Sequence, residues 1–588
     1  MRATDEQLTR RIRRGHGLPY VAALDGIRAV AVAGVVLYHA GARWLPGGFL
    51  GVDLFFVLSG FLITSLLLAE RVATGRIDLP AFWARRARRL LPAAFLVIAL
   101  SVLAVAILSP SDLPSTRADA IASFLYVNNW HQILADQSYF QAFARPSLLR
   151  HLWSLAVEEQ FYLLWPLVMG ICVAALGRRR TTIVTLVLAV ASSGLMAVLF
   201  TPGRDPSRVY YGTDTHATGL LIGALLAFAW PLSREAVRRT RVTALDAAGT
   251  VALALLVVAM LTWNDYEPGV YQGGLGAVAV ITAVLVGAVT HGATRLGAVL
   301  GAQPLRWIGE RSYGIYLWHW PVMALTRPGI DLTWPATVVA AGQIAVTLLL
   351  AAASYRWVEM PIRNRTGFPA LRGWLDRRPP RGRLAIVASL VAAAVVAVAF
   401  VSLRDTPVQA AAPIKARATP AAKIAPASTT PAAAARTRPR RPLGVGASVM
   451  LAAQPALRRV VKVDAAVGRQ APDILDRIRS YRSAGDLPAA VAVQLGENGP
   501  ITDADMTRLR RLLQGVDRVA LINVRIPRSW GDAANDVLAD AAKGWPEARI
   551  ADWHAASAVP GALYPDGTHP TPKGQEIYAQ LVERALER

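Results

Sequence analysis

Apolar runs long enough to cross a membrane recur between residues 20 and 403 of this 588-residue chain, and they constrain its fold more than any other feature. A transmembrane helix needs about 20 predominantly apolar residues. We count about eleven such runs, at 20–40, 49–69, 90–109, 152–176, 182–200, 213–231, 243–263, 270–290, 312–327, 334–355 and 384–403. Because backbone polar groups in lipid must be satisfied internally, these runs predict an all-α polytopic membrane domain of about 11 transmembrane helices. A twelfth stretch, 118–133, carries Asn128, Asn129 and His131 and predicts a loop or a re-entrant helix.

Basic residues cluster in alternate loops between these runs, at 10–14, 85–89, 178–180, 234–241 and 356–383. Because cytoplasmic loops carry an excess of Lys and Arg, the pattern predicts a multi-pass plasma-membrane protein with a cytoplasmic N-terminus. An odd number of spans then places the C-terminal part outside the cell. The net charge of +24 could indicate nucleic-acid binding, but the placement of the basic residues in alternate loops argues otherwise, so we expect the lipid bilayer and no nucleic acid as a partner. The first run lacks a small-residue cleavage site and predicts an anchor.

Composition divides the chain into five segments. They are a cytoplasmic N-terminal segment at 1–19, a membrane domain at 20–383, an additional transmembrane helix at 384–404, an extracytoplasmic linker at 405–442 and a C-terminal extracytoplasmic domain at 443–588. The linker consists of Ala, Pro, Thr and basic residues without apolar periodicity, a composition that cannot bury a core. There is one cysteine and no Cys/His cluster with metal-ligand spacing, so we expect no metal and no bound cofactor.

Short β-branched runs alternate with amphipathic stretches in the C-terminal segment. The candidate strands are 443–446, 459–463, 489–495, 517–524 and 548–552, and the candidate helices are 449–457, 471–484, 502–514, 531–543 and 572–586. Alternation of this kind is typical of an α/β doubly wound domain with a parallel sheet. Functional residues of such domains gather at the carboxyl ends of the strands.

Five residues of the C-terminal segment have the types and places that serine-dependent acyl chemistry requires. Ser448 follows the first strand in LGVGASVML and precedes a helix, and Asp566 and His569 lie three residues apart in YPDGTHPTPKG. A carboxylate that orients an imidazole lets that imidazole activate a serine. Gly468 and Asn498 follow the second and third strands and can complete an oxyanion hole. The alternative is that Ser448 is a helix N-cap and that the Asp/His segment is an ordinary turn.

In this order and at these strand ends, the five residues resemble the SGNH hydrolase family, named for its Ser, Gly, Asn and His. The resemblance implies a catalytic Ser448 with Asp566 and His569, and an oxyanion hole from Gly468 and Asn498. The family usually carries Gly-Asp-Ser at the nucleophile, whereas this chain has Gly-Ala-Ser with Ala447 in the place of the aspartate.

Two ionisable residues lie inside the first apolar run, AALDGIRAVAVAGVVLYHA. At helical spacing, Arg28 and His39 share one face and lie about 16 Å apart along the axis. Ionisable groups at membrane depth are costly and usually mark a site or a pathway. The alternative is an interfacial arginine that snorkels to one surface and a histidine at the other.

Further polar residues occur in or beside later runs. They are Glu158 and Glu159 in HLWSLAVEEQFYLLWP, Asp214 and His216 in YYGTDTHATGLL, Tyr313, Tyr316 and His319 in SYGIYLWHWPV, and Arg356 and Glu359 in SYRWVEMPIR. Each can be an interfacial cap or part of an aromatic belt. Their number in one membrane domain favours a site instead.

These segments, together with LDGIR, FFVLSGFLIT and RRARRLLP, resemble the acyltransferase-3 family of integral membrane O-acyltransferases in their order along 20–365. His216 is a departure, since related proteins often carry Arg there. The attached C-terminal domain resembles the arrangement in peptidoglycan and envelope-glycan O-acetyltransferases.

The resemblance implies that an acyl group, expected to be acetyl, moves from cytoplasmic acyl-CoA to hydroxyls of a cell-envelope glycan or glycolipid. Arg28 would bind the donor or polarise its carbonyl, His39 would act as general base or transient acyl acceptor, and Ser448 would form an acyl-enzyme. Residues expected to bind the donor phosphates or only to anchor the topology are Arg85, Arg86, Arg88 and Arg89. Two other hypotheses stay open: a membrane-tethered serine esterase, and a transporter or flippase.

Overall fold

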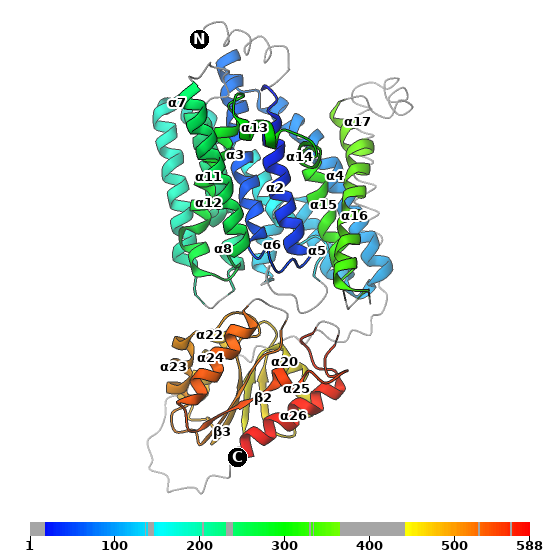
Figure 1. The fold of residues 1–588 in the computed structure, drawn as a ribbon, viewed down its shortest axis with the longest axis vertical. Coiled ribbons are helices and arrows are strands. Elements are labelled where there is room, and N and C mark those ends of the chain that lie inside the picture. The colour runs from blue at the N-terminus through cyan, green and yellow to red at the C-terminus, as the bar shows by residue number, and fades with distance from the viewer. Residues whose placement is uncertain are drawn as a thin grey trace, which may run out of the picture. The chain divides into compact units, whose positions relative to one another are not determined.

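The computed structural model describes residues 18–135, 137–138, 146–202, 205–230, 239–328, 331–332, 334–364, 441–526, 530–564 and 567–587. The chain divides into two compact units, a helical one and a parallel-sheet one (Figure 1). The predicted span at 384–404 and the linker at 405–442, except its last two residues, lie outside the described residues.

The helical unit is built from long apolar helices and short connecting ones. The long helices are α2 (Ala22–His39), α3 (Gly51–Thr74), α4 (Leu79–Leu108), α7 (Leu152–Leu199), α11 (Arg239–Thr262), α12 (Leu275–Val289), α15 (Ser312–Leu325) and α16 (Ala336–Ser354). The short elements are η1 (Gly48–Leu50), η2 (Pro110–Asp112), α5 (Leu113–Phe124), α6 (Asn128–Leu134), α8 (Ser207–Tyr211), α9 (Thr213–His216), α10 (Thr218–Ala229), η3 (Val270–Gly274), α13 (Arg295–Leu300), α14 (Leu305–Glu310), η4 (Tyr355–Glu359) and α17 (Met360–Arg363).

Every predicted span within the described residues falls on helical elements. Seven helices of this part of the chain are long and apolar enough to cross a bilayer. One of them, α7, covers two predicted runs, and between these runs Gly177, with a φ of 76° and a ψ of 167°, interrupts the helix. The helices α10 and α15, with 12 and 14 residues, are shorter than the predicted runs. The helical membrane body is therefore confirmed, whereas the count of eleven spans stays a prediction.

The helices α3 and α10 lie so close together that glycines of each helix approach the backbone of the other. A Cβ built on Gly60 would lie 1.9 Å from the Leu220 carbonyl oxygen, and one on Gly223 would lie 2.1 Å from that of Val57. Small residues let membrane helices approach until their backbones touch. The stretch 118–133, predicted as a loop or re-entrant helix, forms α5 and α6, at the opposite end of the bundle from α13 and α14 (Figure 1).

The second unit contains a five-stranded parallel sheet of order β2-β1-β3-β4-β5. Its strands are β1 (Leu443–Gly446), β2 (Lys462–Ala465), β3 (Ala490–Gln494), β4 (Arg518–Ile522) and β5 (Ala548–Ala551). Its helices are α20 (Ser448–Ala452), α21 (Gln454–Leu457), α22 (Ala471–Ser483), α23 (Asp503–Leu512), α24 (Gly531–Lys543), α25 (Trp553–Ala556) and α26 (Pro572–Glu587). The order reverses at β1, as in doubly wound folds.

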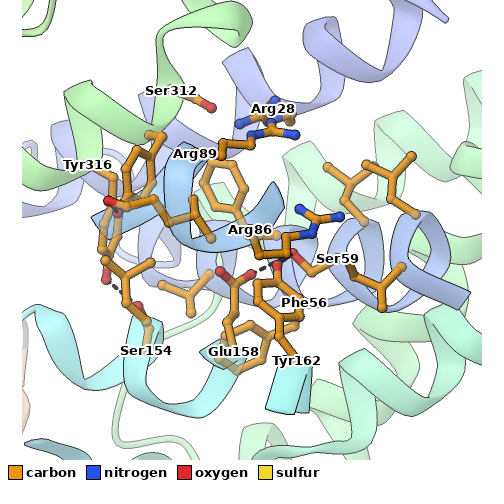
Figure 2. Close-up of a pocket in the computed structure, with 18 residues that line it drawn as sticks. Arg28, Phe56, Ser59, Arg86, Arg89, Ser154, Glu158, Tyr162, Ser312 and Tyr316 are labelled. Atoms are coloured by element: carbon orange, nitrogen blue, oxygen red, sulfur yellow. Dashed lines mark hydrogen bonds between the residues drawn. The ribbon is translucent and has the colours of Figure 1, made fainter. Parts of the chain in front are cut away.

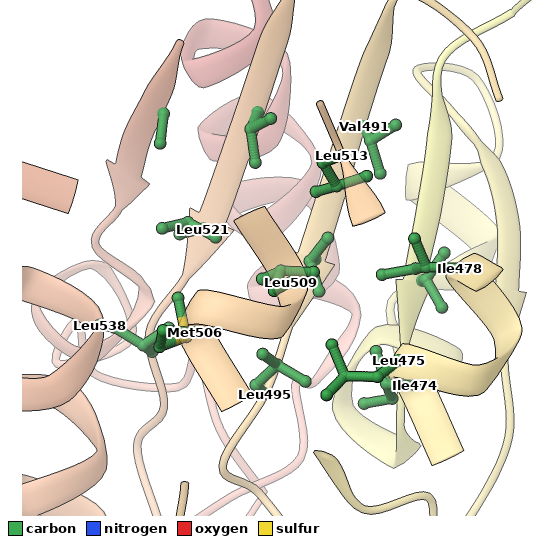
Figure 3. Packing of buried hydrophobic residues seen from close by; sticks show 14 of the residues in the cluster. Ile474, Leu475, Ile478, Val491, Leu495, Met506, Leu509, Leu513, Leu521 and Leu538 are labelled. Atoms are coloured by element: carbon green, nitrogen blue, oxygen red, sulfur yellow. The ribbon is translucent and has the colours of Figure 1, made fainter. Parts of the chain in front are cut away.

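Helices cover both faces of this sheet and bury a separate apolar cluster on each. On one face α22, α23 and α24 pack on the sheet through residues such as Leu475, Leu509 and Leu538 (Figure 3). On the other face α20, α21, α25 and α26 pack through Leu457, Trp553 and Tyr578. The two-layer covering confirms the predicted α/β doubly wound domain.

Candidate functional site

Ser448 and His569, predicted as catalytic partners, contact each other. Ser448 Oγ lies 3.0 Å from His569 Nε2, and only 4% of Ser448 is exposed. A Cβ on Gly446 at the end of β1 would lie 2.9 Å from the Met450 side chain, so a glycine permits the tight passage from strand to helix. A hydroxyl and an imidazole at this distance can act as nucleophile and general base. Asp566, the predicted third member, lies outside the described residues.

The turn that carries His569 is held by backbone contacts beside α26. The Tyr564 N–H donates to the His569 carbonyl at 2.9 Å, and the Thr571 N–H donates to the Ala562 carbonyl at 2.9 Å. Gly574 comes so close that a Cβ there would lie 1.9 Å from the Ala562 oxygen. The imidazole is thus presented by a segment fixed at both ends.

Gly468 and Asn498, predicted as oxyanion-hole donors, lie on the turns after β2 and β3. Since both strands flank β1, these turns lie on either side of the serine turn. Gly468 has a φ of +80°, which favours glycine. The Asn498 side-chain amide donates to the Arg469 carbonyl at 2.9 Å and so joins the two turns.

Glu497 is a residue of this site that the sequence analysis missed. Its Oε2 accepts the Val449 N–H at 3.3 Å, and 7% of the residue is exposed. Burial raises the pKa of Glu497 to about 7, and the Val449 N–H and the His569 ring limit the rise because each favours the charged form. The sequence could have indicated Glu497, because it is an acidic residue directly beside Asn498 at a strand end.

In the helical unit, α2 and α15 bring His39 and His319 together. His39 Nδ1 lies 3.0 Å from His319 Nε2, and His319 Nδ1 lies 2.6 Å from the Tyr316 carbonyl oxygen. A carbonyl only accepts, so in the neutral His319 ring Nδ1 carries the proton and Nε2 accepts from His39. His39 Nε2 then holds the lone pair that a general base or an acyl acceptor uses.

Arg150 and His151 also belong to this cluster, and the sequence analysis missed both. The rings of His151 and His319 are 5.6 Å apart. The Arg150 guanidinium lies 4.5 Å from the centre of the Trp320 ring, which in turn lies 4.8 Å from the His39 ring. Both residues are buried. The sequence could have indicated them, because an arginine and a histidine stand directly before the apolar run of α7.

Five helices of the same unit line a pocket of about 780 Å³, a volume that includes the space open at its mouth. Arg28 from α2 and Arg86 and Arg89 from α4 place three guanidinium groups on it (Figure 2). Glu158 from α7 accepts a hydrogen bond from the Ser59 hydroxyl at 2.6 Å. Aromatic and aliphatic side chains of α3 and α15 line much of the rest. The pocket therefore combines cationic groups with an apolar wall.

Tyr316 connects this pocket to the histidines. Its hydroxyl lies 2.6 Å from Ser154 Oγ, and both residues line the pocket. The same hydroxyl donates to the His151 carbonyl at 2.9 Å, while the Tyr316 carbonyl accepts from His319. Tyr313 also lines the pocket, and its hydroxyl donates to a backbone carbonyl of α4 at 2.7 Å.

Three predicted residues near the pocket do not line it. Arg85 is exposed and lies 3.4 Å from the Glu70 carboxylate. Arg88 donates to the Ala84 carbonyl at 2.9 Å. Glu159 follows Glu158 in α7 but is not part of the lining. Of the basic run at 85–89, only Arg86 and Arg89 line the pocket. They are three residues apart and therefore lie on the same face of α4.

Asp214 and His216 also lie away from the pocket. Asp214 pairs with Arg208 at 2.8 Å near the surface, and His216 Nε2 lies 2.9 Å from the buried Asp53 carboxylate. Glu359 is buried in η4 but is not among the lining residues. In the described part of the chain, no three His, Cys, Asp or Glu residues gather as a metal site.

Comparison with known families agrees with this architecture. Residues 21–356 match the family model described as an acyltransferase domain. This chain belongs to that acyltransferase family. It is therefore an enzyme of the O-acyltransferase class, and the transporter hypothesis is not favoured.

Relatives match along nearly the whole length. The chain is 37% identical to the peptidoglycan O-acetyltransferase OatA of Listeria monocytogenes, over 97% of this chain and 98% of the relative. It is 35% identical to the O-acetyltransferase OatA of Staphylococcus aureus, over 98% of both. A solved structure, the C-terminal catalytic domain of peptidoglycan O-acetyltransferase A from Streptococcus pneumoniae with a methylsulfonyl adduct, is similar at 21% identity and a TM-score of 0.23, covering 25% of this chain and 92% of that one.

Proposed function

We propose that this chain transfers an acetyl group from cytoplasmic acetyl-CoA to hydroxyl groups of extracytoplasmic peptidoglycan through Ser448. The observation that carries the proposal is the 3.0 Å contact between the Ser448 hydroxyl and the His569 ring. The peptidoglycan acceptor and the acetyl group are supported by the names of the relatives, and the membrane step is supported by the acyltransferase family.

The donor binds at the pocket of the helical unit. Guanidinium groups suit phosphates, and Arg28, Arg86 and Arg89 meet at this pocket. His39 lies about 16 Å along α2 from Arg28. A coenzyme A thioester carries its phosphates at one end and its reactive carbonyl at the other, so it can place the first at the arginines and the second at His39. His319 holds the tautomer in which His39 Nε2 can accept a proton or the acyl group.

The outer step follows the chemistry of a serine acyl-enzyme. His569 Nε2 takes the hydroxyl proton as Ser448 Oγ attacks the acyl carbonyl. The bond between that carbonyl and the group that carries it from the membrane site breaks, and the carrier group departs with the proton. A sugar hydroxyl then attacks the ester and gives its proton to His569, and the departing Ser448 oxygen takes that proton back. The Gly468 N–H and the Asn498 amide stabilise the two oxyanions, and Asp566 orients His569.

The test is mass spectrometry of base-labile acetyl groups on peptidoglycan from cells that carry the wild type, His39→Ala or Ser448→Ala. Loss in both variants supports transfer from the membrane site through the outer serine. Loss in His39→Ala with a gain in Ser448→Ala identifies the outer domain as an esterase. No loss in either variant refutes the proposal. Ser483→Ala, at an exposed serine of α22, is the matched control.

A further inference from the structure

Glu497 is a buried carboxyl group at the outer site that the serine mechanism does not use. One carboxylate oxygen accepts the Val449 N–H at 3.3 Å. The other oxygen is buried and has no hydrogen-bond partner among the residues that the structure describes. Burying a polar atom without a partner costs free energy. A carboxyl group in this place therefore calls for a reason other than stability.

The turn that carries Glu497 is held on both sides. Gly496 has a φ of +96°, and its carbonyl accepts the Trp530 ring N–H at 3.1 Å. On the other side, the Asn498 amide donates to the Arg469 carbonyl at 2.9 Å. The turn after β3 thus delivers the carboxyl group to the serine turn after β1 in a fixed position.

The residue before the nucleophile lacks the charge that the SGNH family carries there. Ala447 is 1% exposed and presents only a methyl group. Glu497 reaches the same short turn from the neighbouring strand, where it binds the N–H of the residue after Ser448. We propose that Glu497 is a positioning residue of the outer site and supplies, from the β3 turn, the carboxylate that the family carries at position 447. This inference rests on the proposed role of Ser448.

The surroundings explain what the carboxylate does there. His569, on the turn before α26, interacts electrostatically with Glu497, and so does Tyr578 on α26 itself. The Tyr578 hydroxyl donates to Gln494 at 2.6 Å. His569 becomes cationic when Ser448 attacks, so an ionised Glu497 stabilises that cation while its other contact keeps the serine turn in place.

A carboxylate exchange tests the proposal in the full chain in detergent, with 4-nitrophenyl acetate as the acyl donor. Glu497→Ala should lower kcat about tenfold or more, the usual effect of losing a charged hydrogen-bond acceptor. Ala447→Asp combined with Glu497→Ala should recover most of that loss. Ala447→Asn combined with Glu497→Ala, which restores the shape without the charge, should recover little. Ala447→Asp alone should lower kcat because it crowds two carboxylates together.

The pH profile separates positioning from mere structural support. If activity needs an ionised Glu497 and a neutral His569, log kcat should fall on the acid side with a slope approaching two in the wild type and one in Glu497→Gln. Glu583→Ala, an exposed carboxylate of α26, is the control and should match the wild type. Equal slopes, or an exchange variant no better than Glu497→Ala, overturn the inference. If wild-type Ser448 is never acetylated, as judged by intact mass, the proposed function itself fails.

Discussion

Replacing Glu497 with glutamine should raise the unfolding free energy of the parallel-sheet unit, and by more as the pH rises. Burial raises the pKa of this carboxyl from 4.5 to about 7. The folded state therefore holds the proton more tightly than the unfolded state. The stability that protonation of Glu497 contributes is fully present below pH 4.5 and falls as the pH rises towards 7. Since each pKa unit corresponds to about 1.4 kcal/mol, ionised Glu497 costs about 3 kcal/mol above pH 7.

Glutamine has the shape of the protonated glutamate and carries no charge. The difference in unfolding free energy between Glu497→Gln and the wild type should therefore depend on pH as the ionisation of Glu497 does. We expect a difference of about 1 kcal/mol at pH 5.5 and about 3 kcal/mol at pH 8, in favour of the variant. Pulse proteolysis of the full chain in urea measures this difference through cleavage within the parallel-sheet unit. Glu583→Gln on the exposed face of α26 should show no such difference.

A difference that stays constant between pH 5.5 and pH 8 would refute the assignment of a buried, proton-binding carboxyl at Glu497. A variant that is less stable than the wild type at pH 8 would refute it as well. The expected result, a variant that is more stable but less active, means that the wild type keeps this carboxylate for function at a cost in stability.

Three further outcomes follow from the geometry. Arg89→Ala should raise the KM for acetyl-CoA in radiolabel transfer by membrane vesicles, whereas Arg85→Ala, which removes an exposed arginine, should leave it unchanged. Asn498→Ala should lower kcat with 4-nitrophenyl acetate by about 100-fold or more if its amide stabilises the oxyanion, and an unchanged kcat would exclude that role. Gly60→Val should abolish accumulation of folded protein, measured by size-exclusion chromatography in detergent, because its Cβ would lie 1.9 Å from the Leu220 carbonyl oxygen; normal yield would contradict the close α3–α10 contact.

Apolar periodicity predicted the elements of this fold well, because both bilayer crossing and parallel-sheet burial require continuous apolar runs. The ends of the strands were predicted less accurately: the second strand was expected at 459–463 and forms at Lys462–Ala465. Buried glycine contacts such as Gly60 against Leu220 have no comparable signal, because a glycine in an apolar run does not reveal which helix it touches.

Site residues could be predicted where a short sequence motif by itself indicates the chemistry. Ser448 and His569 were selected from strand ends and turns, and they lie at hydrogen-bond distance. Glu497 was missed because an acid in a strand-to-helix turn is usually solvated, and only the fold shows that it is buried. Asp214 was expected near the membrane site, yet Arg208, six residues earlier, pairs with it near the surface.

The separation of Arg28 from His39 along α2 suggests how one helix can serve two parts of a donor. The arginine lines the cationic pocket, whereas the histidine contacts His319 about 16 Å further along the helix axis. Tyr316 belongs to both places, since its hydroxyl meets Ser154 at the pocket and its carbonyl accepts from His319. A small anion would occupy only the pocket and leave the histidines untouched. The donor proposed above, a coenzyme A thioester, carries phosphates at one end and a thioester at the other and would reach both places, whereas a free acyl phosphate would not.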